Sequence, residues 1–172
     1  MELDCGQCKV RSWQSTDVES LVRHANNRRI WLNLRDQFPH PYTETDGHRW
    51  IETNLSAKPE THFAIDVFGE AVGGIGFELK TDVERHSAEV GYWLGEEFWS
   101  RGICTAALKR ATPYAIEAYH LNRIFALPYS ENLASIRVLE KADYRKECLM
   151  RQSAFKNGRF LDQLLHAFVV ER

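Results

Sequence analysis

The chain has 172 residues, a formal net charge of −2, and 44% hydrophobic and 27% charged residues. This length and composition predict one globular domain over residues 1–172, with a core that needs no disulfide or metal. The charge argues against a nucleic-acid partner, and the lack of a long apolar run argues against a transmembrane helix or a membrane partner.

The N-terminal segment from Met1 to Lys9 has no apolar core of the kind found in secretory signals. A cytoplasmic protein with free thiols is therefore expected. Cys5 and Cys8 form a Cys-x-x-Cys pair, but no second pair at zinc-finger spacing accompanies them. We expect an exposed N-terminal tail here, with zinc or redox chemistry as the alternative.

Caps, turn residues and hydrophobic periodicity predict the elements in chain order. In the first third of the chain, a strand and then three helices are expected at Val10–Trp13, residues 15–26, Arg28–Arg35 and Thr45–Leu55. Further strands are expected at His62–Phe68, Glu70–Leu79, Ala88–Leu94, Ile124–Leu127, Tyr144–Phe155 and Phe160–Val170. Two further helices are expected at Thr105–Tyr119 and Glu131–Lys141. This order predicts an α+β fold: a mixed, mostly antiparallel sheet of six to seven strands with helices on both faces.

The turn between one strand and the next helix is the clearest functional signal. The segment 101–105, Arg-Gly-Ile-Cys-Thr, follows the strand Ala88–Leu94 and opens a long helix. Gly102 would let the backbone approach an anion closely, and the amides of a first helical turn have no intrahelical acceptor. The turn therefore predicts a site for a phosphate-bearing ligand. Because the Walker and dinucleotide glycine motifs are absent, nucleotide triphosphatases and Rossmann enzymes are disfavoured.

Two ordered blocks of sequence, together with this turn, resemble a known family. The first block is Glu89–Leu94 with Phe98–Gly102 and Thr105–Leu108, and the second is Asn132–Tyr144. Together they resemble the acetyl-coenzyme A site of the GNAT N-acetyltransferases, and in particular the RimJ/RimL-like group, which acetylates protein N-termini and related amines. The resemblance covers nearly the whole chain. It implies an N-acetyltransferase that uses acetyl-coenzyme A (acetyl-CoA) and no metal.

The resemblance also implies which residues hold acetyl-CoA. The backbone of Trp93 and Leu94 is expected to bind the pantetheine arm, the turn to bind the pyrophosphate, and Asn132 to bind a pantetheine amide. The expected cofactor-binding residues are Trp93, Leu94, Arg101, Gly102, Ile103, Cys104, Thr105, Ala106, Asn132 and Ser135. Cys104 stands where the family has a smaller residue, and we expect it to fill space rather than to react.

Direct attack by an amine needs a base for the ammonium proton and an acid for the leaving thiolate. Glu89, on the strand that leads to the turn, is the expected base, acting through water; a structural carboxylate is the alternative. Many relatives place a tyrosine acid where this chain has Leu139. Ser135 is therefore the expected substitute acid, directly or through water, with a plain helix-surface serine as the alternative.

The acceptor site is expected in the loop before the third helix, where the RimJ/RimL-like group has a Pro-Tyr segment. The expected lining residues are Trp31, Phe38, His40 and Tyr42, and His48 and Glu44 are further base candidates. The sequence leaves two acceptor classes open: protein N-termini, which need an open groove, and small amines, which need a closed acidic pocket. Monomer and homodimer both fit.

Two alternatives come from other functional classes. The missing tyrosine keeps open a coenzyme A-binding sensor or regulatory protein that has the fold without catalysis. An unrelated phosphate-ligand protein would have no affinity for coenzyme A. Binding without turnover would favour the first alternative, and absence of binding would favour the second.

Overall fold

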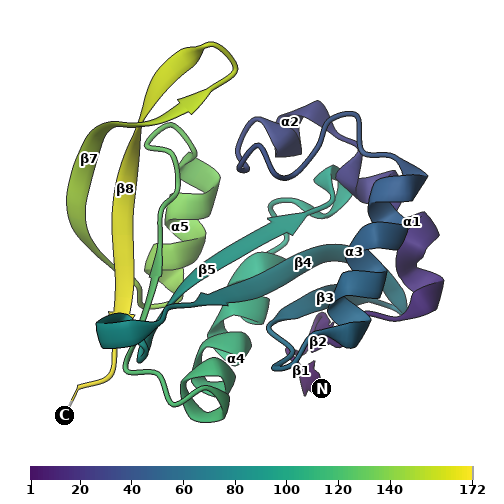
Figure 1. Ribbon diagram of the computed structural model, residues 1–172, viewed down its shortest axis with the longest axis horizontal. Coiled ribbons are helices and arrows are strands. Elements are labelled where there is room, and N and C mark those ends of the chain that lie inside the picture. The colour runs from purple at the N-terminus through teal and green to yellow at the C-terminus, as the bar shows by residue number, and fades with distance from the viewer. Residues whose placement is uncertain (172) are drawn as a thin grey trace.

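A computed structural model describes residues 1–171, which form an α+β fold around one sheet (Figure 1). Within these residues the sheet has eight strands in the order β1-β2-β3-β4-β5-β6-β8-β7. The strands are Glu2–Asp4 (β1), Lys9–Arg11 (β2), His62–Val67 (β3), Glu70–Leu79 (β4), Ser87–Leu94 (β5), Arg123–Ala126 (β6), Arg145–Lys156 (β7) and Arg159–Val169 (β8). β5 and β6 are parallel and all other neighbours are antiparallel, which confirms the predicted mixed sheet.

The eighth strand lies in the segment that was expected to be an exposed tail, and that expectation is wrong. β1 and β2 form a hairpin that turns at Gly6, whose φ of 82° suits glycine. Cys8 is buried, and the Asp4 carbonyl accepts a hydrogen bond from Arg110 Nε at 3.1 Å. A three-residue strand is too short to show a reliable period. Among residues 1–171 no group of His, Cys, Asp and Glu is arranged to hold a metal ion.

Helices cover both faces of the sheet, as predicted. The helices are Val18–Ala25 (α1), Arg28–Trp31 (α2), Glu44–Ser56 (α3), Ile103–Ala118 (α4) and Leu133–Lys141 (α5), with 3-10 turns at Ser15–Asp17, Asp82–Glu84 and Glu96–Phe98. α1 and α3 pack on one face around Trp13 and Leu21. α4 and α5 pack on the other face around Leu108 and Leu139. α2 is shorter than predicted, and the chain continues from it as a loop to Thr43, the N-cap of α3.

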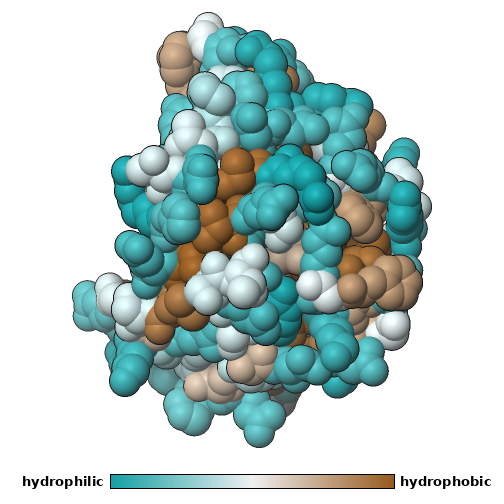
Figure 2. Space-filling view, turned by 90° about the vertical axis from the view of Figure 1, so that its right-hand side faces the viewer, coloured by the Kyte–Doolittle hydropathy of each residue, from teal (hydrophilic) through white to brown (hydrophobic). Residues whose placement is uncertain are grey.

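The outer side of α1 and α3 is mostly hydrophilic, with a band of hydrophobic surface between charged and polar residues (Figure 2).

No helix in the described part of the chain combines the length and apolar character needed to cross a bilayer.

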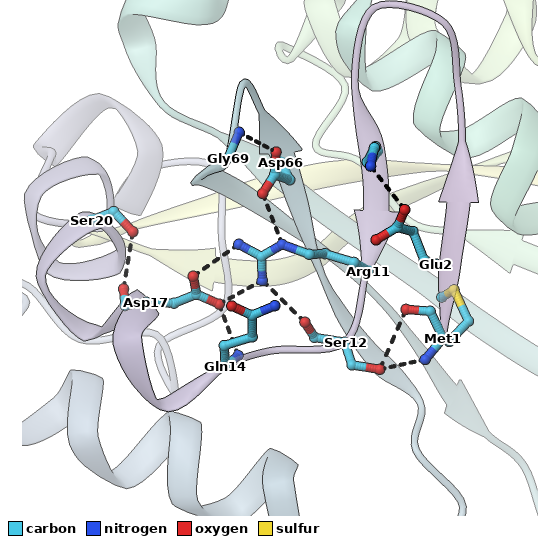
Figure 3. A network of polar contacts seen from close by, with 10 residues as sticks. Met1, Glu2, Arg11, Ser12, Gln14, Asp17, Ser20, Asp66 and Gly69 are labelled. Carbon is cyan, nitrogen blue, oxygen red and sulfur yellow. Dashed lines mark hydrogen bonds and ion pairs between the residues drawn. The ribbon is translucent and has the colours of Figure 1, made fainter.

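A buried ion network fastens the N-terminal strands to the first helical turn (Figure 3). Arg11 on β2 donates to Asp17 at 2.7 and 2.9 Å and to Asp66 on β3 at 2.8 Å. Both carboxylates accept a further hydrogen bond at 2.8 Å: Asp17 Oδ2, which already accepts from Arg11, also accepts from the Gln14 amide, and Asp66 Oδ1 accepts from the Gly69 amide. Such complete pairing is what a buried charge requires.

The sheet splits between β5 and β6, and this split positions the site. The two strands pair only at Ser87–Glu89 with Arg123–Phe125, after which β6 ends and β5 continues to Leu94. β4 follows β5 along its whole length, whereas β6 turns away with β8 (Figure 1). The stretch Val90–Leu94 therefore has one open edge.

Candidate active site

The register of β5 decides which backbone groups line the split. The Gly95 amide donates to the Val72 carbonyl at 2.7 Å and the Lys80 amide donates to Ser87 at 2.9 Å. Because hydrogen-bonded pairs alternate along an antiparallel ladder, the backbone of Trp93 pairs with β4, while the groups of Tyr92 and Leu94 point into the split. The expected pair Trp93 and Leu94 is thus divided by the register, and Tyr92 replaces Trp93 at the open edge.

The turn before α4 has the shape of an anion cradle. Gly102 is the N-cap of α4 with φ 79° and ψ 1°, and Ser100 also has a positive φ of 61°. The first helical hydrogen bond runs from the Ala106 amide to the Gly102 carbonyl at 3.0 Å. The amides of Ile103, Cys104 and Thr105 therefore remain available, whereas that of Ala106, which was also expected to serve, is already bonded.

Three neighbouring side chains, those of Arg101, Gln7 and Cys104, surround the anion cradle. Arg101 is exposed, with its guanidinium 5.4 Å from the centre of the Phe98 ring. A Cβ on Gly102 would lie 3.2 Å from Gln7 Nε2, because the β1–β2 turn packs against the cradle. Burial raises the pKa of the Cys104 thiol to about 12, so the thiol stays protonated at neutral pH. An uncharged, half-buried thiol is suited to filling space, which agrees with the expected role of Cys104.

On the α5 side of the split, a tyrosine and a serine form a pair that the sequence did not reveal. Asn132 caps α5, with its Oδ1 accepting from the Ser135 amide at 3.2 Å, which leaves the Asn132 NH₂ group free of that bond. Tyr92 Oη lies 2.9 Å from Ser135 Oγ and 3.0 Å from the Ser135 carbonyl. Leu139 is fully buried in the core. Desolvation raises the pKa of the Tyr92 phenol, with the Ser135 bond opposing it, so Tyr92 keeps its proton.

Tyr92 was missed because the alternation of β5 places it with the core residues Val90 and Leu94. In the structure Tyr92 does lie on the same face of β5 as Val90 and Leu94, but it is half-buried, whereas Val90 and Leu94 are buried. A hydroxyl on an inward face needs a hydrogen-bond partner, and that requirement was the available signal.

Glu89 lies on the opposite face of β5, in contact with two cations. Its carboxylate contacts Arg35 Nη2, lies 3.6 Å from Lys80 Nζ, and its side chain is 13% exposed. Arg35 also reaches Glu78 at 3.1 Å. Beside Glu89, a Cβ added at Gly91 would meet no atom within 4 Å, so there is open space along the strand. Neither Arg35 nor Lys80 was among the expected site residues.

The structure divides the expected acceptor residues into two groups. Phe38 contacts Trp93 of β5, with ring centres 5.7 Å apart, and Tyr42 with ring centres 5.0 Å apart. Tyr42 is buried, and this burial raises the pKa of its phenol, so Tyr42 belongs to the core. Trp31 and His40 form a second pair further out, with ring centres 5.8 Å apart.

The two additional base candidates lie elsewhere. His48 and Glu44 are 3.7 Å from each other on the exposed side of α3, with side chains 58% and 82% exposed. Their only ion-pair contact within residues 1–171 is with each other. Of the three base candidates, Glu89 is the one on β5, at the point where its pairing with β6 ends.

A pocket lies between the α2 loop and the β7–β8 hairpin, and Arg35, the ion-pair partner of Glu89, is one of its lining residues. Its volume is about 240 Å³, and its lining residues are Arg35, Asp36, Leu127, Tyr129, Ala154, Phe155, Lys156 and Gln163. Arg35 connects the pocket to Glu89, and Leu127 follows directly after β6. The pocket thus opens next to the point where β5 and β6 separate.

Comparisons with known proteins identify the family of the chain. The family model described as an acetyltransferase (GNAT) domain matches residues 8–145. The uncharacterized N-acetyltransferase YoaA of Bacillus subtilis is 29% identical over 141 residues, covering 82% of this chain and 73% of its own. The spermidine N(1)-acetyltransferase of Escherichia coli is 22% identical over 153 residues, covering 88% and 80%.

A solved structure of RimL, a ribosomal L7/L12 alpha-N-protein acetyltransferase in complex with coenzyme A, superposes with a TM-score of 0.87. It is 19% identical, and the alignment covers 99% of this chain and 98% of that one. At this identity the likeness concerns the fold, while the family model matches most of the chain. The chain belongs to the GNAT family and is an N-acetyltransferase of the GNAT type.

Proposed function

We propose that this protein transfers an acetyl group from acetyl-CoA to a primary amine by direct attack in a ternary complex. The observation that carries the proposal is that the anion cradle at Gly102 lies at the end of the open edge of β5. A ligand with a pyrophosphate at one end and an amide-containing arm at the other fits this arrangement, since the edge offers backbone groups as an added strand would.

The described residues supply each part of such a ligand site. The amides of Ile103, Cys104 and Thr105, with the Arg101 side chain, would hold the pyrophosphate. The backbone groups of Tyr92 and Leu94 that face the split, with the free NH₂ of Asn132, would hold the pantetheine arm. The Leu94 carbonyl already accepts from Trp99 Nε1 at 2.7 Å, which leaves the Leu94 amide as the donor. Acetyl-CoA supplies the activated acetyl group.

Glu89 is proposed to accept the proton of the substrate ammonium group through water. Gly91 leaves open space beside it, and the pocket begins at Arg35, its ion-pair partner. A carboxylate held by Arg35 and Lys80 has a defined position on the strand that borders the split. The amine must be neutral before attack, so a nearby proton acceptor is required.

Tyr92 and Ser135 are proposed to protonate the leaving thiolate in place of the tyrosine that Leu139 replaces. Ser135 Oγ would give its proton to sulfur and take one from Tyr92 Oη, 2.9 Å away, and solvent would then return a proton to the phenolate. Burial favours the protonated phenol, so the proton donor is present before the transfer. The pair also favours an enzyme over a protein that only binds coenzyme A, because it offers a proton donor although Leu139 stands where many relatives have the tyrosine acid.

Isothermal titration with acetyl-CoA, followed by thiol release with peptides and small amines, tests the proposal. We expect binding that Gly102→Val weakens, because valine is strained at φ 79° and crowds Gln7. We expect turnover that Tyr92→Phe lowers by about tenfold or more, within the range of general acid–base effects, at unchanged acetyl-CoA affinity. Binding without turnover of any amine would favour a coenzyme A sensor, and absence of binding would refute the proposal.

A further inference from the structure

A buried lysine joins the acceptor loop to the far side of the split. Lys156 ends β7, beside the Asn157–Gly158 turn, and its side chain is only 2% exposed. Its Nζ lies 2.7 Å from Asp36 Oδ1 and 3.8 Å from the centre of the Trp31 ring. A desolvated ammonium needs both a counter-charge and further contacts, and here the carboxylate and the aromatic face supply them.

The contacts join two segments that are far apart in the chain. Trp31 ends α2 and Asp36 lies in the loop that follows, whereas Lys156 belongs to the β7–β8 hairpin, which lies on the other side of β5 from α2 (Figure 1). A second contact runs the same way, from Tyr129 Oη to the Leu34 carbonyl at 3.4 Å. The segment 31–36 is thus held to the β6–β8 side at two points. We name Lys156, Asp36 and Trp31 the clasp.

Two of the three clasp residues, Asp36 and Lys156, line the pocket that Arg35 connects to Glu89. The pocket volume is about 240 Å³, and its ionisable lining residues other than Tyr129 are Arg35, Asp36 and Lys156. Asp36 is already paired with Lys156, and Glu89 is already paired with Arg35 and Lys80. The pocket is thus not the acidic one expected for a small amine: its single carboxylate, Asp36, is paired with Lys156 through Oδ1, and the lining carries one net positive charge. Glu89 is left to attract one ammonium group, whereas a second one would meet this positive lining.

We propose that Lys156 is a specificity-determining residue: its clasp on Trp31 and Asp36 closes the acceptor side over Glu89 and restricts the acceptor to a small amine that brings no second positive charge. This inference rests on the proposed acetyl transfer to an amine. A peptide would have to pass between segment 31–36 and the β7–β8 hairpin, which the clasp holds together. A polyamine would bring a further ammonium into a lining whose carboxylate is occupied.

Two variants open the clasp from opposite sides. Lys156→Met keeps an unbranched side chain for the buried position and removes the charge. Asp36→Asn changes a side chain that is 75% exposed, so folding should be retained even where Lys156→Met proves unstable. Arg159→Gln is the matched control, because Arg159 flanks the same turn but pairs with Glu131, 2.6 Å away and outside the acceptor loop.

The experiment compares kcat/KM for glycinamide, spermidine and an N-terminal octapeptide, with acetyl-CoA affinity and amide hydrogen exchange of residues 32–43 measured alongside. We expect the unmodified protein to prefer glycinamide. Both clasp variants should raise the ratio of octapeptide to glycinamide kcat/KM at least about fivefold, accelerate exchange in residues 32–43, and leave the acetyl-CoA Kd unchanged. Arg159→Gln should change none of these quantities.

An unchanged ratio in both clasp variants, despite faster exchange, would overturn the inference while leaving acetyl transfer intact. A preference of the unmodified protein for spermidine or for the octapeptide would also overturn it. Failure of the proposed function has a different signature: no acetyl-CoA binding, or no thiol release with any acceptor, in the unmodified protein. In that case the specificity role of Lys156 is refuted as well, whatever the exchange rates are.

Discussion

Two arginines in this molecule each join two carboxylates, and their surroundings differ sharply. Arg11 pairs with Asp17 at 2.7 Å and Asp66 at 2.8 Å, and all of these side chains are 6–7% exposed. Arg35 pairs with Glu78 at 3.1 Å and contacts Glu89, but its own side chain is 50% exposed. The same chemical arrangement is therefore closed in one region and open in the other.

The difference indicates which network holds the fold and which serves the site. Hydrogen bonding to Asp17, opposed by burial and assisted by Asp66, raises the pKa of Arg11. Its charges are fully paired away from water, so removing one partner leaves a buried charge without compensation. Around Arg35, water screens the charges and the pairs contribute little to stability. Arg35 lines the pocket, where a solvent-accessible charge can meet a substrate.

The largest expected effect is on stability and comes from the closed network. Arg11→Gln should lower the free energy of unfolding by about 3–5 kcal/mol, because Asp17 and Asp66 would stay buried without a cation. Lys9→Gln on the same strand is the control; its partner Glu2 is 59% exposed, and the expected loss is below about 1 kcal/mol. Urea denaturation of both variants measures the difference. Equal losses would contradict the claim that the closed network around Arg11 stabilises the fold more than an exposed pair does.

The next effect is on catalysis and comes from the open network. Glu89→Gln should lower kcat by about 10²–10⁴-fold, the usual range for loss of a general base, with acetyl-CoA affinity retained. Since a base works only when deprotonated, the rate of the unmodified protein should fall towards acid pH. That acid limb should be missing in the variant. A functional Glu89→Gln protein with an unchanged pH–rate profile would remove Glu89 from the mechanism.

The smallest effect separates Arg35 from Glu89. Arg35→Gln removes a positive charge from the pocket that the substrate ammonium group enters, so it should lower the KM for the acceptor about tenfold, or roughly 1.4 kcal/mol, and leave kcat within about threefold. The free energy of unfolding should change by less than about 1 kcal/mol, because Arg35 and Glu78 are about half exposed and Lys80 still contacts the less exposed Glu89. Steady-state kinetics and urea denaturation of one preparation test both statements. A stability loss as large as that of Arg11→Gln would show that the open network is structural too.

The regions of the molecule also differ in how far the sequence alone predicted them. Most of the proposed cofactor side, apart from Asn132 and Ser135, belongs to one continuous segment from Glu89 to Ala106, in which a strand, a glycine turn and a helix follow in order. Local rules are enough for such a segment, because alternation, a positive φ at Gly102 and unpaired first-turn amides depend on neighbours in the chain. The Asn157–Gly158 turn was predictable for the same reason.

Where local signals were short or ambiguous, the prediction was incomplete. β1 has three residues and no visible period, so the N-terminal hairpin was taken for a tail. Alternation put Tyr92 on the core face, which is correct, but gave no indication that this face meets Ser135 of α5, 43 residues later in the chain. The backbone of Trp93 bonds to β4 while that of Leu94 faces the split, and this depends on which residues of β5 form hydrogen-bonded pairs with β4. The sequence of β5 alone does not determine that register.

The sequence by itself determined the family, the mixed sheet and the anion-binding turn, because each depends on residues adjacent in the chain or on two ordered blocks. The tertiary structure alone decided the acceptor side. Glu89 meets Arg35 from 54 residues away, and Lys156 meets Asp36 from 120 residues away. Long-range charge pairs and aromatic contacts have no local period. They form only when the sheet splits and brings the α2 loop and the β7–β8 hairpin to the same opening.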